Sequence, residues 1–341
     1  MSTLYIDRQG SQLSTQNGVL HISTPDGSTH RRLPLKYLRR VVLRTDTQLS
    51  SKALCALAEE GVHLIALGGR GGQQVAQISG SGHNDARRRW QQVLALSQPD
   101  TCAQLAQALV HSKVKRQRTT LAQLASARPD LRKPLHDGQQ RLGRIQQTLQ
   151  TPATDTPANT TDTPRQRLDR IRGLEGAAAA HYFEAYFQAF APALGATSRN
   201  RRPPRDPVNA LLSLSYTLLY GQASAACWAA GLDPALGALH TLSHNRAALA
   251  CDLMEPYRPQ IDHWVWQRFQ QDELRAEHFG RDGSGACLLG KAGRGIFYAA
   301  WEQHAHHTQR SLQRYASALA SSLLHSGPTN PWSHLDEADP L

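Results

Sequence analysis

The residues GSGHND, Gly80 to Asp85, separate two parts of the chain that have different hydrophobic patterns. Before them, apolar and polar residues alternate in short runs such as "VLHIST", Val19 to Thr24, which is typical of half-buried strands. After them, apolar residues recur every three or four positions, which is typical of amphipathic helices. We therefore interpret residues 81–86 as a linker between a β-rich domain, 1–80, and a helical domain, 87–326.

Turn signals divide the first part into short strands. Asn17-Gly18 and Asp26-Gly27 predict hairpin turns, because both positions of such turns tolerate positive φ. One amphipathic helix, Ser50 to Glu60, is expected between two later strands. Together the patterns predict an α+β multidomain protein, in which a small β-sandwich-like domain precedes a larger all-α domain.

Two segments of the second part lack the helical pattern. "TPATDTPANTTDTPR", Thr151 to Arg165, contains three prolines and no large apolar residue, so we expect a mobile loop inside the helical domain. The tail, residues 327–341, is expected to be disordered.

The composition favours a partner that is a polyanion. Lys and Arg number 38 against 27 Asp and Glu, and the formal net charge is +11. A surface of this kind attracts nucleic acid by its long-range field. Five cysteines without a CxxC pair indicate neither a disulfide framework nor a zinc site. With no signal-peptide pattern and no long apolar run, we expect a cytoplasmic protein that does not enter a membrane.

The segment from Arg172 to Phe190 contains a carboxylate that should face the interior. Helical spacing places Glu175 on the same face as Tyr182 and Tyr186, and Glu184 on the opposite face. An inward carboxylate is costly unless it is paired or bound to a metal. An ion pair with Arg172, one turn earlier, and a metal site are both consistent with this pattern.

Further acidic and His residues follow. Asp252 and Glu255 share one helix face one turn apart, an arrangement that commonly holds a divalent cation. His240 could join them if the chain turns between, where Ser243 or Asn245 could cap a new helix. The alternatives for His240 are a satisfied core residue or, with His244, a zinc protease motif that lacks its glutamate.

Basic residues near these segments are candidates for DNA contact, although a solvated surface explains them as well. Phosphate contact is expected from six of them: Arg201, Arg202, Arg205, Arg258, Lys291 and Arg294.

Several segments resemble, in order and spacing, the signature segments of the CRISPR-associated protein 1 family. They are "HSKVKRQRTTL", "RGLEGAAAAHYF", "RPPRDPVNALLSLSYTLLY", "GLDPALGALH" and "LACDLMEPYRP". The resemblance implies a metal-dependent DNA endonuclease and integrase that inserts new spacers into a CRISPR array. It also implies a homodimer, with the β-rich domain serving assembly, and a small dimeric helper of the CRISPR-associated protein 2 family. Double-stranded DNA would be the substrate.

The same resemblance implies roles for particular residues. Glu175, His240 and Glu255 match the family's metal ligands, and Asp252 matches a neighbouring acidic residue needed for activity. Two carboxylates and an imidazole suit Mg²⁺ or Mn²⁺. Two other functions stay open from the residues alone: a stand-alone repair or junction nuclease, and a non-catalytic DNA-binding scaffold.

Overall fold

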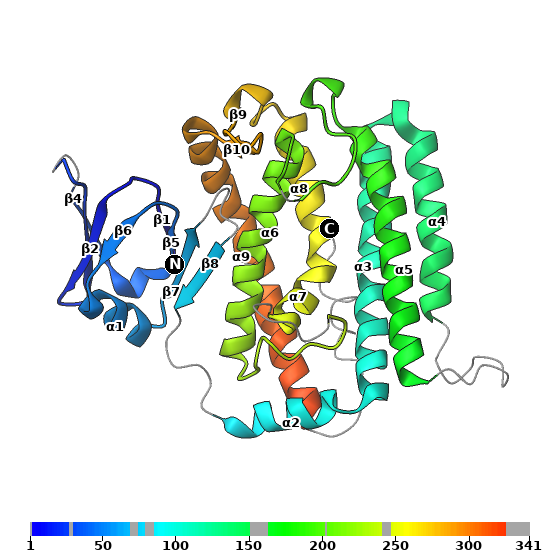
Figure 1. Ribbon diagram of the computed structural model, residues 1–341, viewed down its shortest axis with the longest axis horizontal. Helices are drawn as coiled ribbons and strands as arrows, with labels where there is room; N and C mark the ends of the chain where they lie inside the picture. The colour runs from blue at the N-terminus through cyan, green and yellow to red at the C-terminus, as the bar shows by residue number, and fades with distance from the viewer. Residues whose placement is uncertain are drawn as a thin grey trace. The chain divides into compact units, whose positions relative to one another are not determined.

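The chain forms two compact units, which we describe separately. A computed structural model describes residues 2–26, 30–68, 74–78, 85–150, 163–201, 203–240 and 247–324. The first unit contains residues 1–84 together with Phe297–His306, and the second contains the rest of the chain. A small strand region thus precedes a mostly helical region, as the hydrophobic patterns predict (Figure 1).

The first unit is built from two four-stranded sheets. The strands are β1 (Ser2–Ile6), β2 (Ser11–Gln16), β3 (Val19–Ser23), β4 (His30–Pro34), β5 (Leu38–Leu43), β6 (Thr47–Leu49), β7 (His63–Gly68) and β8 (Gln74–Ile78). One sheet has the order β1-β5-β7-β8 and the other the order β4-β3-β2-β6. A shared core of leucines, isoleucines and valines from both sheets, including Leu4, Leu20 and Val41, supports the sandwich-like prediction.

Local signals place the turn and the helix of this unit as predicted. Asn17 and Gly18 both have positive φ and join β2 to β3 as an antiparallel hairpin. Helix α1 (Ser51–Glu59) begins after Ser50, whose side chain accepts a hydrogen bond from the Ala53 N–H at 3.1 Å. The second predicted hairpin turn includes Gly27, which lies outside the described residues.

A segment far along the chain completes the first unit. Glu302 accepts hydrogen bonds from the Thr3 N–H at 3.1 Å and the Tyr5 hydroxyl at 2.8 Å. The Tyr5 ring stacks on Tyr298 with 4.1 Å between centroids. The sequence pattern assigned residues 297–306 to the helical domain, because their apolar residues have helical spacing. This spacing gives no indication of the contacts with β1.

The second unit consists mainly of helices. They are α2 (Ala86–Leu96), α3 (Pro99–Ala127), α4 (Arg132–Gln150), α5 (Pro164–Tyr186), α6 (Pro207–Ala229), α7 (Ala248–Met254), α8 (Arg258–Gln270) and α9 (Lys291–Leu324), of which α9 also supplies the segment in the first unit. Helices α3, α4 and α5 pack against one another, and α8 packs against both α3 and α6 (Figure 1). None of the helices in the described part of the chain is long and apolar enough to span a membrane.

The all-α prediction for this unit is wrong in one place. Strands β9 (Phe279–Arg281) and β10 (Cys287–Leu289) form a two-stranded antiparallel sheet. Each strand has three residues, too few for alternation to be recognised in a sequence. The sheet leads directly into α9, so that the "GKAGRG" segment, Gly290 to Gly295, lies at a helix start.

Other expectations fall partly or wholly outside the described residues. These are the linker at 81–86, of which 85 and 86 are described, the loop at 151–165 and the tail at 327–341. The loop prediction extended too far, because Pro164 already begins α5. Thr163 caps this helix: its hydroxyl accepts from the Gln166 N–H at 3.3 Å, and the Gln166 side chain accepts from the Thr163 N–H at 2.8 Å.

Candidate active site

Three of the predicted site residues meet in the second unit although they come from distant parts of the sequence. Glu175 lies in the middle of α5, and Glu255 begins a 3₁₀ turn, Glu255–Tyr257, between α7 and α8. His240 lies in the irregular segment after α6, with its Nε2 atom 4.0 Å from Glu255 Oε1. A fourth residue, Lys113 of α3, brings the two glutamates together.

Lys113 donates hydrogen bonds to both carboxylates. Its Nζ atom is 2.6 Å from Glu255 Oε2 and is also hydrogen bonded to Glu175 Oε1. The side chains of Lys113 and Glu255 are 7% and 6% exposed, whereas that of Glu175 is 29% exposed. The Lys113–Glu255 pair is therefore the inner end of the cluster. Glu175 is on its solvent side.

The charges of this cluster balance one another. Glu255 accepts from Arg258 Nε at 2.8 Å as well as from Lys113. Burial opposes the ionisation of Glu255, but the positive charges of Arg258 and Lys113 outweigh it and hold the pKa of this carboxyl well below its usual range. Burial likewise opposes the charged form of Lys113, and the two glutamates nevertheless raise its pKa. Glu255, Lys113 and Arg258 therefore stay ionised at neutral pH.

Asp252 contacts the backbone and the His240 ring, whereas Lys113 contacts the two glutamates. Its Oδ2 atom accepts from the N–H groups of Ala238 at 2.6 Å and Leu239 at 3.0 Å. Its Oδ1 atom accepts from the His240 N–H at 3.1 Å and lies 2.6 Å from His240 Nδ1. A carboxylate oxygen accepts, so the ring donates to Asp252 through Nδ1, and this places Nε2 on the side of Glu255.

Asp252 and Glu255, which the spacing places on one helix face, have different partners in the structure. Although they are one helical turn apart, Asp252 is used to position His240, whereas Glu255 faces Lys113. The segment before His240 can approach Asp252 because residue 237 is a glycine. A Cβ atom at Gly237 would lie 2.7 Å from Asp252 Oδ2 and 2.7 Å from the Ala248 carbonyl carbon, which is too close.

The segment that carries His240 is also held from α5. Arg172 Nε donates to the Leu239 carbonyl at 2.9 Å, and its NH1 atom donates to Asp169 at 3.0 Å. Arg172 was one of two partners expected for Glu175, and this alternative is wrong, since Lys113 takes that place. Glu184, on the opposite face of α5, is exposed and pairs with Arg141 at 3.0 Å, as the helical spacing predicts.

The chain does turn between His240 and Glu255, although not as predicted. Ser243 and Asn245, the expected caps, lie outside the described residues, and α7 begins after Ala247, which makes no side-chain cap. The Leu249 N–H instead donates to the Pro234 carbonyl at 2.8 Å. Helix α8 then begins at Arg258.

Two prolines lie between α7 and the body of α8. Pro256 and Pro259 are at the starts of the 3₁₀ turn and of α8. Proline is tolerated there, because the first N–H groups of a helix have no partner within it.

The basic residues expected at DNA differ in their surroundings. Arg258 pairs with Glu255, and its guanidinium lies over the Tyr216 ring at 4.5 Å, so its role here is to hold the glutamate. Arg201, Arg205 and Lys291 are exposed. Arg294 is half-buried and donates to the Leu289 carbonyl at 3.2 Å, and Arg202 lies outside the described residues.

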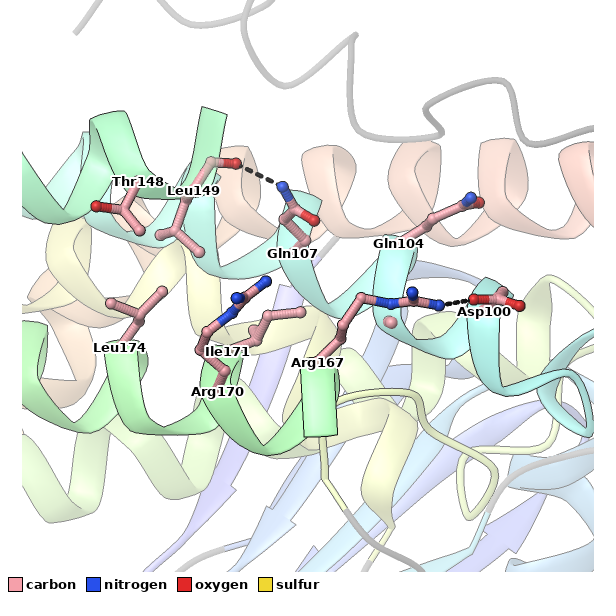
Figure 2. Close-up of a pocket in the computed structure, with 10 residues that line it drawn as sticks. Asp100, Gln104, Gln107, Thr148, Leu149, Arg167, Arg170, Ile171 and Leu174 are labelled. Atoms are coloured by element: carbon pink, nitrogen blue, oxygen red, sulfur yellow. Dashed lines mark hydrogen bonds and ion pairs between the residues drawn. The ribbon is translucent and has the colours of Figure 1, made fainter. Parts of the chain in front are cut away.

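A pocket of about 200 Å³ lies between α3, α4 and α5 (Figure 2). Arg167 of α5 pairs with Asp100 of α3 at its rim, and Gln107 Nε2 donates to the Leu149 carbonyl at the end of α4 at 2.8 Å. These contacts tie α3 to both neighbouring helices and so fix the helix of Lys113 against that of Glu175. The lining residues are Asp100, Ala103, Gln104, Gln107, Thr148, Leu149, Arg167, Arg170, Ile171 and Leu174.

The donor atoms suit a divalent cation. Two carboxylates and an imidazole nitrogen are ligands that Mg²⁺ and Mn²⁺ accept, and a carboxylate that fixes the imidazole is common behind metal-bound histidines. The carboxylates already converge on a cation, the ammonium of Lys113. Over the residues that the structure describes, no three His, Cys, Asp or Glu side chains surround an open cation position.

Sequence reasoning missed Lys113, although a signal for it exists. Leu109, Val110, Val114 and Gln117 form the buried face of α3, and Lys113 follows Leu109 by one turn. A lysine at a buried position of an apolar stripe needs a carboxylate partner. The surrounding "KVKRQR" run concealed this signal by suggesting a uniformly basic surface.

Comparison with known proteins finds one family along most of the chain. The family model for "CRISPR associated protein Cas1" matches residues 4–303. The CRISPR-associated endonuclease Cas1 1 of Thermodesulfovibrio yellowstonii is 31% identical over 304 residues, which is 89% of this chain and 91% of that protein.

Two solved structures share the fold. A casposase bound to integration product aligns with a TM-score of 0.79 at 19% identity and covers 96% of this chain and 92% of that one. A Cas6-RT-Cas1–Cas2 complex aligns with a TM-score of 0.77 at 23% identity and covers 96% of this chain and 35% of that one. At these identities the likeness concerns the fold. The family model and the relative show more: this chain belongs to the Cas1 family of CRISPR-associated proteins.

Proposed function

We propose that this chain is a metal-dependent DNA endonuclease and integrase that joins a 3′-hydroxyl of incoming DNA to a phosphodiester of a CRISPR repeat. The observation that carries the proposal is the meeting of Glu175, His240 and Glu255, from three separate segments, at the edge of a buried charged cluster. A structural ion pair would require neither the imidazole nor the partial exposure of Glu175. These two features also argue against a non-catalytic scaffold.

Each residue has a distinct part in this proposal. Glu175, Glu255 and His240 Nε2 would hold Mg²⁺ or Mn²⁺, which would neutralise charge on the phosphate and activate a hydroxyl. Asp252 fixes the imidazole through Nδ1, and Arg258 keeps Glu255 ionised and oriented. Glu175 and His240 form the accessible side of the cluster, so the DNA backbone would approach from there.

The relatives support the choice of DNA as the substrate. The relative from Thermodesulfovibrio yellowstonii is named an endonuclease, and the casposase structure contains an integration product. The net charge of +11 provides long-range attraction to double-stranded DNA. Among the predicted DNA-binding residues, Arg201, Arg205 and Lys291 are exposed and thus the best placed to contact phosphates.

The proposed assembly is a homodimer bridged by a Cas2-family helper. A spacer must be joined at both ends, and each chain has one Glu175–His240–Glu255 cluster in its described residues. Two active sites at a set separation are therefore needed. The solved Cas1–Cas2 complex that shares this fold supports the choice of helper.

A strand-transfer assay tests the proposed function. Short duplex DNA and a repeat-bearing plasmid are incubated with the protein and its helper, with Mg²⁺ or Mn²⁺, and joined products are counted. Products should require the metal, and products joined at both ends should require the helper. Glu175→Gln should abolish joining, because it removes a charged ligand, whereas Glu184→Gln, on the exposed face of α5, should not. Equal activity of the two variants would refute the assignment.

A further inference from the structure

The ammonium of Lys113 lies where the proposed metal would lie. It is hydrogen bonded to one oxygen of Glu175 and is 2.6 Å from one oxygen of Glu255. Mg²⁺ and Mn²⁺ bind carboxylate oxygens at about 2.0–2.3 Å, so an ion that reached both glutamates would occupy nearly the same point. Two cations at such a separation repel strongly in a buried site. The ammonium and the metal therefore compete for the same oxygens.

Charge balance favours replacement of the Lys113 ammonium by a metal ion once DNA is bound. Lys113 and Arg258 together match Glu175 and Glu255, so the cluster has no unbalanced charge without a metal. A divalent ion would add two positive charges. A DNA phosphate on the accessible side, beside Glu175 and His240, would restore part of the balance.

We propose, on the basis of the proposed function, that Lys113 exchanges partners during the reaction. In the metal-free protein it holds the two carboxylates together. A divalent ion displaces its ammonium, which then pairs with a phosphate of the bound DNA. Lysine is suited to this exchange, since its ammonium is a point charge on a flexible four-carbon stem, while the stem stays anchored in α3. Arg258, which is planar and packed on Tyr216, keeps its contact with Glu255.

Mn²⁺ binding to the full-length protein without DNA tests the first half of the proposal. Free Mn²⁺ is measured by electron paramagnetic resonance during a titration of wild type, Lys113→Met and Lys115→Met. Lys115 is exposed on the same helix, so its variant loses the same charge without a competing cation. Lys113→Met should bind Mn²⁺ at least tenfold more tightly than the other two. Unchanged or weaker binding would overturn the exchange.

Strand transfer at saturating Mn²⁺ and DNA tests the second half of the proposal, which is the contact between Lys113 and a DNA phosphate. Lys113→Met should join DNA at least tenfold more slowly than Lys115→Met, despite its tighter metal binding. Equal rates would show that Lys113 makes no productive phosphate contact. The combination of tighter metal binding with slower joining would not arise from a role confined to folding.

The failure of this inference can be distinguished from failure of the proposed function. If the wild type binds no Mn²⁺, or if Glu255→Gln binds it as tightly as the wild type, the metal site itself is wrong. If the wild type binds Mn²⁺ and Lys113→Met binds it equally well, the metal site stands and the exchange is wrong.

A second measurement keeps the test decisive should Lys113→Met fail to fold. The wild-type protein is acylated with an amine-reactive reagent, and modification at Lys113 is compared with that at Lys115 by mass spectrometry. Because Lys113 is buried between carboxylates, its modification should be slow without metal and at least threefold faster with saturating Mn²⁺. If Mn²⁺ leaves the ratio unchanged, the ammonium is not displaced.

Discussion

Glu255 and Asp262 are two buried carboxylates close together in the chain, yet their surroundings differ in chemistry. Glu255 faces the side chains of Lys113 and Arg258. Asp262, in α8, accepts from the Tyr216 hydroxyl through Oδ1, and its backbone carbonyl accepts from the Tyr186 hydroxyl at 2.8 Å. Burial opposes ionisation at both, but it prevails only at Asp262, whose pKa it raises to about 6, while nearby cations lower the pKa of Glu255.

The difference shows which buried acid is suited to bind a cation. Burial alone drives a carboxylate toward its neutral form, in which it binds metals weakly. Glu255 keeps its charge because cations surround it, and one of them, Lys113, can leave. Asp262 has hydroxyl partners that orient it within the core. Arg258 connects the two regions, since it pairs with Glu255 and lies over the ring of Tyr216.

The largest expected effect is on strand transfer, which should depend far more on Glu255 than on Asp262. Glu255→Gln should reduce strand transfer at least about 100-fold, because it removes a charged ligand of the catalytic ion. Asp262→Asn should retain activity within about threefold, since an amide oxygen can still accept from Tyr216. Joined products measured at saturating DNA and helper would show this. Similar losses of activity in both variants would mean that Glu255 has no catalytic role beyond that of a buried carboxylate such as Asp262.

The next effect concerns the residue that orients His240. Asp252→Asn should weaken Mn²⁺ binding about 10- to 100-fold, as is usual when the partner of a metal-bound histidine is changed. The amide would also place a donor against the backbone N–H groups of residues 238–240. Excess Mn²⁺ should restore much of the strand transfer, which it should not do for Glu255→Gln. Asp130→Asn, at an exposed site paired with Arg128, is the control. Direct ligation by Asp252 would instead give a loss that Mn²⁺ cannot restore.

The smallest effect is a pH dependence of stability that Asp262 causes. Its pKa is about 6 in the folded protein and 3.8 ordinarily, so the folded form binds a proton more readily. The stabilising contribution is complete below pH 4 and is lost as the pH rises through 6, by at most about 3 kcal/mol. Glu255, with its lowered pKa, contributes in the opposite direction.

Urea unfolding of the wild type and of Asp262→Asn at several pH values measures this dependence. The difference between the two proteins isolates Asp262, because Glu255 contributes to both. Relative to the variant, the wild type should lose stability between pH 4 and pH 6. A constant difference across this range would show that Asp262 ionises normally in the core.

Part of this arrangement could be predicted from local patterns, and part could not. The inward face of Glu175, the outward face of Glu184 and the cap at Ser50 follow from residues within one or two turns. The role of Asp252 does not, because its partners lie across an irregular segment. Spacing shows that Asp252 and Glu255 share a helix face. It does not show that one faces the backbone and the other a lysine of α3.

Local patterns thus predicted that a strand region precedes a helical region, and composition gave the basic character of the chain. They also named the candidate metal ligands. These properties depend on side-chain chemistry and on periodicities of two and 3.6 residues. Tertiary structure alone decided that Lys113 lies between Glu175 and Glu255, and that residues 297–306 complete the N-terminal unit. Such pairings depend on how elements that are distant in the sequence pack against each other. The partner of a buried charge can therefore be identified only when the positions of both residues in the fold are known.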